Sequence, residues 1–263
     1  MNRLDYQQIF DVRGESYNRA CIEHPQAREE ERQQLIRRLH LPADGVFCDA
    51  PAGGGYLSDG VNQQRGDITV YCIEPSTQFS EQINPGFNVL HNQLDSIQLP
   101  GRSLDALGSL AGLHHIVDRR PVFKTWQQLL KPDGVLAVAD VELGSDVGKF
   151  LNGFVDRYTP DGHDGYFFRD GEFSELMLHQ GLIDVEECFE PLHWQFNNQR
   201  EAASFCRDLF FLQGISLQDI ALALEQELGL CRALESDEWL LPWGLRYARG
   251  CKPADDDTIG VGQ

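Results

Sequence analysis

The sequence predicts an α/β fold with a parallel sheet, from two observations. Short apolar runs at 46–48, 68–73, 104–110 and 135–141 alternate with segments rich in helix formers. Strands that alternate with helices are joined by right-handed crossovers and lie parallel. In addition, the stretch 45–57, GVFCDAPAGGGYL, has the pattern of a buried strand, a tight glycine turn and the start of a helix. The chain is organised around this turn.

The N-terminal region precedes the glycine turn, and its sequence predicts a helical cover over residues 1–40. Residues 1–24 mix aromatic and polar side chains, and the segment after Pro25 is rich in helix formers, with an apolar stripe near its end. After the turn we expect a helix over 57–64, a strand over 68–73, and a helix that Ser76 caps and Pro85–Gly86 ends. A third strand is expected over 87–90.

The second half of the chain continues the alternation and then departs from it. A fourth strand over 104–110, a helix over 119–130, a turn at 131–134 and a fifth strand over 135–141 come first. Residues 143–172 form a long polar and aromatic insertion that we interpret as a lid. A helix over 172–180, a strand over 183–189, helices over 199–212 and 216–228, and a last strand over 240–248 follow. We expect one domain over 41–252, a helical cover at 199–230 and a disordered acidic tail at 253–263.

Composition excludes several classes of partner. The 263 residues include 22 Lys and Arg against 41 Asp and Glu, a net charge of −19. Nucleic acid and anionic membranes both require clustered cations, so we expect neither as a partner. Seven cysteines form no CxxC pair, and no apolar stretch is long enough to span a bilayer. These features predict a cytoplasmic protein with reduced thiols, either a monomer or a homodimer.

The glycine turn gains meaning from an acidic residue after the next strand. Glu74 follows Asp49 by 25 positions and stands at the carboxyl end of the second strand, where a carboxylate can accept both hydroxyls of a ribose. A surface glutamate at a strand end is the alternative. Pro51 stands where a dinucleotide fingerprint needs its first glycine, and no Lys-Ser or Lys-Thr follows as in a P-loop.

Four motifs in order resemble those of the class I S-adenosylmethionine-dependent methyltransferases, in particular the branch that acts on small molecules. They are the segment 49–55, Glu74, the Asp-x-x-x-Leu-Pro loop at 95–100, and the Leu-Lys-Pro-Asp-Gly turn at 130–134. The resemblance covers about residues 44–142. Two positions differ from the family pattern, because Pro51 and Asp133 each replace a glycine.

The resemblance implies a fold, a cofactor and a set of contacts. The fold is Rossmann-like, with a seven-stranded sheet whose last strand is antiparallel, flanked by helices and covered over the acceptor site. The cofactor is S-adenosyl-L-methionine, which becomes S-adenosyl-L-homocysteine. By position, the family's cofactor contacts correspond to Tyr17, Asp49, Ala50, Pro51, Ala52, Gly53, Gly55, Glu74, Pro75, Ser76, Asp95, Ser96, Leu110 and Ala111. Among these, Asp49 would hold the methionine amino group, Glu74 the ribose and Asp95 the adenine.

Candidate catalytic groups follow the fourth and fifth strands. His114 and His115 come directly after the fourth, and Asp140 and Glu142 lie at the end of the fifth, at the edge of the sheet where ligands bind. Methyl transfer needs a base only if the acceptor must lose a proton. His115 is the preferred base, with His114 and His163 as alternatives. A structural role in packing or hydrogen bonding explains the histidine pair equally well.

The acceptor site is expected under the aromatic insertion. Its segment 157–168 combines aromatic side chains with glycines, as a lid over an acceptor would, although the aromatics could also pack on the core. We expect Tyr158, Tyr166, Phe167 and Trp194 to contact the acceptor, with His193 beside Trp194. No two candidate ligands show the close spacing typical of a metal site, so we expect no metal.

The sequence therefore predicts transfer of a methyl group to an oxygen, nitrogen or carbon atom of a small metabolite. One alternative is a carboxyl methyltransferase that acts on a free or carrier-bound acid, which would require a cationic approach to the site. The other is a protein that binds S-adenosylmethionine without catalysis, because a fold does not guarantee an activity. The sequence does not identify the acceptor, because acceptor loops vary freely on a rigid scaffold.

Overall fold

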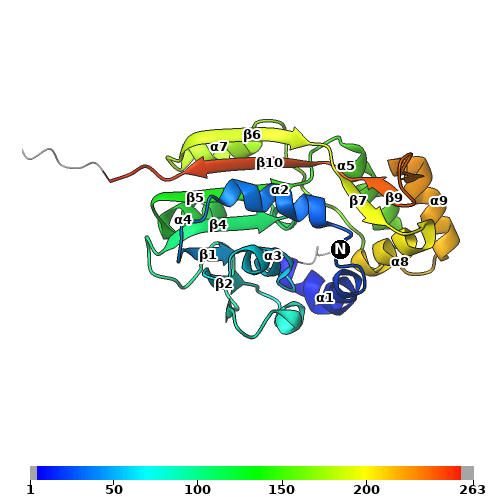
Figure 1. The fold of residues 1–263 in the computed structure, drawn as a ribbon, viewed down its shortest axis with the longest axis horizontal. Helices are drawn as coiled ribbons and strands as arrows, with labels where there is room; N and C mark the ends of the chain where they lie inside the picture. The colour runs from blue at the N-terminus through cyan, green and yellow to red at the C-terminus, as the bar shows by residue number, and fades with distance from the viewer. Residues whose placement is uncertain (1–4, 256–263) are drawn as a thin grey trace, which may run out of the picture.

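Seven strands form the central sheet of the computed structural model, which describes residues 5–255 (Figure 1). Their order across the sheet is β3-β2-β1-β4-β5-β10-β6. The strands are β1 (Val46–Asp49), β2 (Thr69–Ile73), β3 (Asn88–Leu90), β4 (Leu104–Leu110), β5 (Leu130–Asp140), β6 (Ile183–Glu190) and β10 (Leu245–Cys251). Only β10 runs antiparallel to its neighbours β5 and β6, and the other pairs are parallel. The predicted sheet, with its antiparallel last strand, is confirmed.

Alternating side chains of the strands pack on two layers of helices. On one face, Phe47 and Ala137 join the core formed with α2 (Glu29–Leu39) and α3 (Tyr56–Gln64). On the other face, Cys48 and Val138 pack against α4 (Arg120–Leu129) and α7 (Glu172–His179). Because successive side chains point to opposite faces of a strand, these short apolar runs are buried on both sides.

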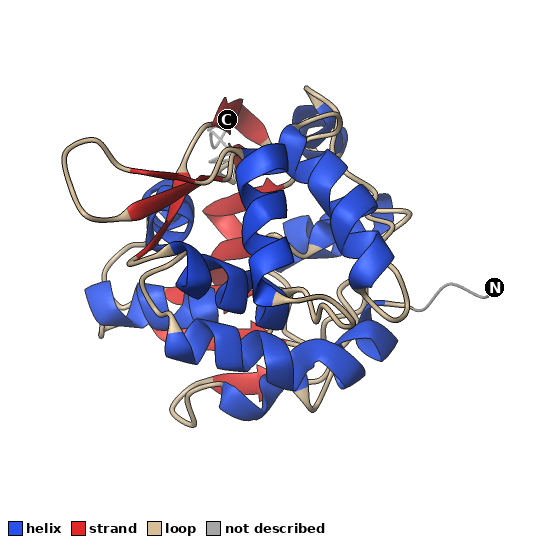
Figure 2. Ribbon diagram, turned by 90° about the vertical axis from the view of Figure 1, so that its right-hand side faces the viewer, coloured by secondary structure: helices blue, strands red, loops and turns tan. Residues whose placement is uncertain are grey.

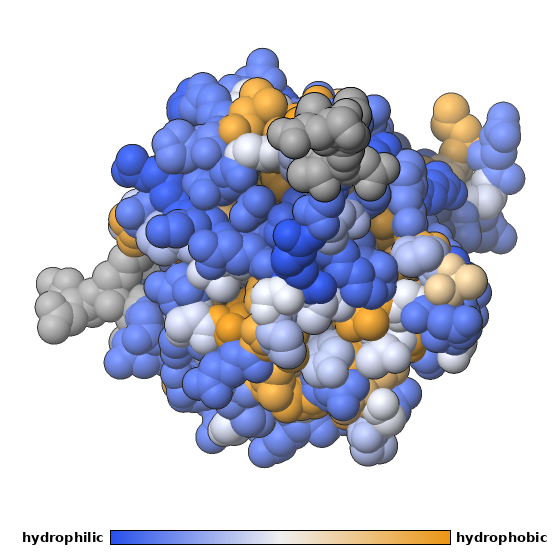
Figure 3. Space-filling view, turned by 90° about the vertical axis from the view of Figure 1, so that its left-hand side faces the viewer, coloured by the Kyte–Doolittle hydropathy of each residue, from blue (hydrophilic) through white to orange (hydrophobic). Residues whose placement is uncertain are grey.

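A second group of elements covers the end of the sheet at which the parallel strands terminate (Figures 1 and 2). It contains α1 (Tyr6–Glu23), α5 (Asp146–Phe150), the π-helical turn η3 (Leu151–Val155), α6 (Asp156–Tyr158), α8 (Gln199–Leu209) and α9 (Leu217–Leu228). A small sheet of β7 (His193–Phe196), β9 (Trp239–Pro242) and β8 (Cys231–Arg232) lies with them. The opposite end of the molecule is mostly hydrophilic, with separate apolar patches (Figure 3).

Three elements differ from the sequence prediction. The expected last strand is two strands, β9 and β10, in different sheets; they are separated at Gly244, where an added Cβ would lie 2.2 Å from the ring of Phe189. β5 starts at Leu130 and includes the expected turn, because Asp133 with φ +62° lets the strand continue through an irregular register with β4. The helix expected after Ser76 is only the 3₁₀ turn η1 (Phe79–Gln82). Another 3₁₀ turn, η2 (Leu113–His115), follows β4.

The N-terminal helix α1 packs directly on the glycine turn. Asp5 and Gln8 form a capping box that starts the helix, with Gln8 N donating to Asp5 Oδ1 (2.9 Å). Farther along, Asn18 donates to the carbonyl oxygen of Phe79 (2.9 Å), and Ser16 donates to that of Asp208 (2.8 Å). A Cβ added to Gly54 would lie 2.0 Å from Asn18 Oδ1. The absence of a side chain at Gly54 is therefore what lets α1 approach the turn.

The expected acidic tail is only partly described. Residues 253–255 follow β10, and Asp255 forms an exposed ion pair with Arg102. Residues 256–263 lie outside the described part of the chain, as do residues 1–4. The domain limits drawn from the sequence, including the N-terminal cover over 1–40, stay predictions.

We expect Gly54→Ala to destabilise the protein by about 1–3 kcal/mol, because the new methyl group must displace the Asn18 side chain of α1 from its hydrogen bond to the carbonyl oxygen of Phe79. Gly66→Ala is the matched control, since no atom lies within 4 Å of the Cβ it would add. Chemical unfolding of the three proteins measures the effect. Equal stability of the two variants would contradict the close approach of α1.

Candidate active site

The turn between β1 and α3 places two buried carboxylates close together. Asp49, at the end of β1, accepts hydrogen bonds at Oδ2 from the backbone nitrogen (3.1 Å) and hydroxyl (2.8 Å) of Ser58. Gly53 and Gly55 have φ values of +54° and +89°, which favour glycine. Gly53 N donates to Glu74 Oε2 (2.8 Å) and so joins the turn to the end of β2.

Glu74 connects three separate elements. Its Oε2 also accepts from the hydroxyl of Tyr6 on α1 (2.9 Å), and its Oε1 accepts from the backbone nitrogen of Ser76 (2.9 Å). Its side chain is fully buried. Burial raises the pKa of Glu74 to about 7 although its hydrogen bonds oppose the shift, and burial likewise raises the pKa of Asp49 to about 7.

A cavity of about 470 Å³, here called the turn cavity, opens over these groups. Seven of the predicted cofactor residues line it, namely Tyr17, Asp49, Pro51, Ala52, Gly53, Leu110 and Ala111. Ala50, Glu74, Pro75 and Ser76 are buried and Gly55 lies in the turn, but none of these five lines the cavity. Asp95 and Ser96 are exposed and also lie outside the lining. The roles of all these residues stay predictions.

One wall of the turn cavity is aromatic, and it combines the predicted Tyr17 with Tyr6, Phe10 and Phe79, which sequence reasoning did not assign to the site. Phe10 of α1 stacks on Phe79 of η1, with ring centroids 4.5 Å apart, and Tyr17 meets Phe79 edge to face at 5.0 Å. Tyr6 completes this wall. A signal was present in the sequence, because residues 6, 10, 13 and 17 fall on one face of a helix.

A second cavity of about 610 Å³, here called the histidine cavity, adjoins the first. The two share four lining residues, namely Phe10, Tyr17, Arg28 and Ala111. The histidine cavity is otherwise lined by Arg13, by three histidines and by apolar groups that include Trp194, Trp243 and Phe210. The shared residues make the two cavities neighbouring compartments of one site.

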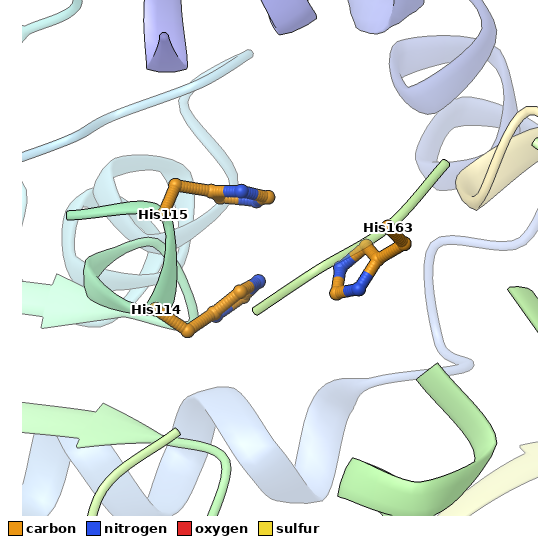
Figure 4. A group of neighbouring side chains, drawn as sticks. All are labelled: His114, His115 and His163. Atoms are coloured by element: carbon orange, nitrogen blue, oxygen red, sulfur yellow. The ribbon is translucent and has the colours of Figure 1, made fainter. Parts of the chain in front are cut away.

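The three histidines come together from separate parts of the chain. His114 Nδ1 bonds Asp140 Oδ1 at 2.7 Å, and the backbone nitrogen of His114 donates to Asp140 Oδ2 at 3.0 Å. His115 packs edge to face on Phe10 (5.4 Å). His163, from the insertion after β5, bonds Asn152 Oδ1 through Nδ1 at 3.1 Å. The three rings face one another across a short gap (Figure 4).

Two buried arginines, Arg13 and Arg28, lie at this site, although the net charge of the chain is strongly negative. Arg28, which sequence analysis did not single out, pairs with the fully buried Glu31 and donates to the hydroxyl of Tyr17. Trp194 Nε1 donates to the same Glu31 (2.7 Å). Arg13 donates to the carbonyl oxygen of Gly162 (2.8 Å) and forms no ion pair within residues 5–255. Burial lowers the pKa of Arg13 and the charge of nearby Asp161 opposes the shift, and a guanidinium stays charged in proteins.

The predicted acceptor residues divide between the cavity and its surroundings. Trp194 lines the histidine cavity, and Phe167 packs on His114 with ring centroids 5.8 Å apart. Tyr158 and Tyr166 lie outside the lining, Tyr158 against Phe154 and Tyr166 at the surface. Glu142 pairs with Arg246, and the backbone nitrogen of His193 donates to Glu30. The involvement of these residues in acceptor binding stays a prediction.

Comparison with known proteins agrees with this geometry. Residues 48–138 match the family model of a methyltransferase domain, and no curated protein sequence matches the chain. A Thermotoga maritima protein described as an S-adenosylmethionine-dependent methyltransferase, possible histamine N-methyltransferase, has a TM-score of 0.64 at 18% identity, with 94% of this chain and 99% of that chain covered.

Two other structures are similar. Phosphoethanolamine N-methyltransferase 2 from Haemonchus contortus, in complex with phosphomonomethylethanolamine and S-adenosylhomocysteine, has a TM-score of 0.65 at 12% identity, over 95% of this chain and 60% of that chain. The [4+2]-cyclase SpnF has a TM-score of 0.63 at 14% identity, over 96% of this chain and 98% of that chain. At these identities the structures establish the fold.

The comparisons establish the fold and a matching segment. The chain has the fold of the class I S-adenosylmethionine-dependent methyltransferases, and its residues 48–138 match the model of a methyltransferase domain. No helix within residues 5–255 combines the length and the apolar character needed to cross a membrane.

The raised pKa of Glu74 predicts a dependence of stability on pH. Between the ordinary glutamate pKa of about 4.3 and the folded value of about 7, the folded protein binds more protons than the unfolded chain. Glu74 therefore contributes stability below pH about 4, and this contribution is lost as the pH rises through about 7.

We expect the free energy of unfolding of the native protein, relative to that of Glu74→Gln, to fall by up to about 3 kcal/mol between pH 4.5 and pH 7.5. Urea unfolding without cofactor at several pH values measures it. Glu81→Gln, which removes an exposed carboxylate, is the control and should not change the pH dependence. A constant difference between native protein and Glu74→Gln would refute the raised pKa.

Proposed function

We propose that this protein transfers a methyl group to an oxygen, nitrogen or carbon atom of a small metabolite. The observation that carries the proposal is the pair of adjoining cavities, which share Phe10, Tyr17, Arg28 and Ala111. A nucleoside cofactor in the turn cavity would present its methyl group at this junction. The acceptor in the histidine cavity would then be aligned with it, and alignment supplies much of the rate of a displacement.

Two buried carboxylates suit the cofactor, Asp49 in the lining of the turn cavity and Glu74 outside the lining but bonded to Gly53 of the turn. Glu74 would accept hydrogen bonds from the ribose, and Asp49 would hold the amino group of the methionine part. Gly53 supports this fit, because an added Cβ would meet Phe79 at 2.8 Å and fill the space beside the turn. When bound, S-adenosylmethionine supplies an electrophilic methyl group on a good leaving group. The protein would then orient the acceptor and accept the proton that the acceptor loses.

His114 is best placed to take that proton. A carboxylate only accepts hydrogen bonds, so the short contact from Asp140 fixes the proton of neutral His114 on Nδ1 and leaves Nε2 basic. The sequence ranked His115 first. The structure favours His114 because Asp140 orients and stabilises it as a third group orients a catalytic base.

Arg13 favours an acceptor that carries an anionic group. A buried guanidinium without an ion pair in the described chain is suited to a carboxylate or phosphate of the ligand. The same observation supports the second candidate, a carboxyl methyltransferase, in which the anionic group itself receives the methyl group. An ester product is cleaved by mild alkali, whereas an ether or a methylamine is not, so product stability separates the two.

The charge and the cysteines of the whole chain bear on the class of acceptor and on the cellular compartment. The net charge of −19 is unfavourable for a nucleic-acid or anionic membrane partner, which leaves a small molecule as the acceptor. All seven cysteines are free, as in a reducing compartment, so we propose a cytoplasmic enzyme. A binding protein without catalysis is disfavoured by the paired His114 and Asp140, which binding alone does not need.

We expect His114→Ala to bind S-adenosylmethionine within about twofold of the native affinity and to lose at least about 100-fold in turnover. Calorimetric titration measures binding, and release of S-adenosylhomocysteine over a library of anionic metabolites measures turnover. The exposed His179→Ala is the control and should keep full activity. A native protein that fails to bind near-millimolar cofactor would exclude the proposal.

We expect Arg13→Gln to raise the KM for the anionic acceptor by at least about tenfold, because a charge-assisted hydrogen bond is lost. The dissociation constant of S-adenosylmethionine should stay the same. Arg120→Gln, at a side chain that is 74% exposed, is the matched control. An unchanged KM in Arg13→Gln would place the anionic group elsewhere.

A further inference from the structure

Three imidazoles converge at one wall of the histidine cavity in a way that resembles a ligand set. Ligand nitrogens of His114, His115 and His163 all lie within 4.8 Å of one another. The ring centroids are 4.2, 5.6 and 5.7 Å apart. A divalent ion about 2.1 Å from each nitrogen needs ligand nitrogens about 3.4 Å apart in tetrahedral geometry, so side-chain movements of about an ångström are sufficient.

The neighbours of two of these histidines fix which nitrogen can bind. Asp140 Oδ1 holds the proton of neutral His114 on Nδ1. Asn152 Oδ1 accepts from the backbone nitrogen of Gly165 (2.8 Å), while its Nδ2 donates to the carbonyl oxygen of Gly165 (3.0 Å). The amide orientation is therefore set, and His163 Nδ1 must donate to Asn152. In both neutral rings Nε2 carries the lone pair, and such second-layer partners are typical of histidines that bind metal.

Two carboxylates near the cluster favour a cation, whereas Arg13, which lines the same cavity, opposes one. The fully buried Asp140 lies behind His114, and Asp156 accepts from the backbone nitrogen of His163 (2.7 Å). His114 and His163 are themselves only 6% and 8% exposed.

We propose that His114, His115 and His163 bind one divalent transition-metal ion, with zinc as the reference ion. Three protein ligands leave at least one coordination position open, as in catalytic sites, and this position faces the histidine cavity. A hydroxyl or carbonyl oxygen of the acceptor is the ligand that would fill it. The proposal departs from the sequence expectation of no metal, because residues 114, 115 and 163 become neighbours only in the fold.

The consequence for catalysis rests on the proposed function, whereas the binding site does not. An acceptor hydroxyl on the ion would lose its proton to solvent more readily, because the ion stabilises the oxyanion. The oxygen lone pair would form the new bond to the methyl carbon while the sulfur–methyl bond breaks. The bonding pair stays on sulfur and gives S-adenosylhomocysteine, so no oxidant or reductant is required. His114 would then act as a ligand and not as the base.

The test is a titration of the full chain without cofactor or acceptor. The protein is treated with a chelator, dialysed, and titrated with Zn²⁺ by calorimetry and with Co²⁺ by visible absorption. We expect one ion per chain, a Co²⁺ spectrum of nitrogen and oxygen ligands, and no thiolate-to-metal charge transfer. Cys188→Ser with Cys231→Ser, at the two exposed cysteines, should bind the ion equally well.

The variants assign the ligands. His114→Ala and His163→Gln should each weaken Zn²⁺ binding at least about 100-fold, and Asp140→Asn, which alters only the second layer, about 10- to 100-fold. His179→Ala, at an exposed histidine, should bind as the native protein does. Circular dichroism checks that each variant is folded, and the native Co²⁺ spectrum stands independently of any variant.

Two results would overturn the metal site. One is the lack of stoichiometric Zn²⁺ binding by the native protein, and the other is unchanged binding in folded His114→Ala and His163→Gln. Titration of the same samples with S-adenosylmethionine separates this failure from failure of the proposed function. A protein that binds cofactor and turns over acceptor equally well with and without chelator would be a methyltransferase without the metal site.

Discussion

The buried carboxylate of Glu74 is the interaction on which the rest of the site depends. It joins the hydroxyl of Tyr6, the backbone of Gly53 and the backbone of Ser76, and these belong to α1, the glycine turn and the loop after β2. A carboxylate without these donors would be costly to bury. The packing of the N-terminal helix on the sheet and the geometry of the glycine turn therefore depend on the same buried carboxylate.

The parts of the fold that sequence reasoning predicted are those fixed by local pattern. Phe47 and Cys48, like Ala137 and Val138, are apolar neighbours whose side chains must both be buried, which only a strand covered on two faces allows. The division between β9 and β10 was not predicted. It falls at Gly244, against which the ring of Phe189 lies, and that ring comes from a distant part of the chain.

The candidate site likewise contains residues that the sequence predicts and residues that only the fold brings together. Asp49 and Glu74 stand at the ends of adjacent strands, so their spacing in the sequence already implies that they are close in space. Arg28 and the histidine cluster could not be predicted in this manner, because His163 reaches His114 only through the insertion after β5 and its hydrogen bonds to Asn152 and Asp156. Tyr6, Phe10 and Tyr17 on α1 are spaced at the helical period. However, too few apolar residues accompany them to mark the segment as a core helix.

The lone pairs of Glu74 suggest how the proposed cofactor contact would be linked to α1. A carboxylate offers about four acceptor positions, and Tyr6, Gly53 and Ser76 already occupy three of them. Two ribose hydroxyls in the proposed position would therefore displace one donor. Gly53 and Ser76 donate from backbone close to the strand ends, whereas Tyr6 donates from a side chain on α1. Under this proposal Tyr6 would be the donor that leaves, and its helix also carries Phe10, Arg13 and Tyr17 into the histidine cavity. Cofactor binding would then reshape the wall of the acceptor compartment through the same helix.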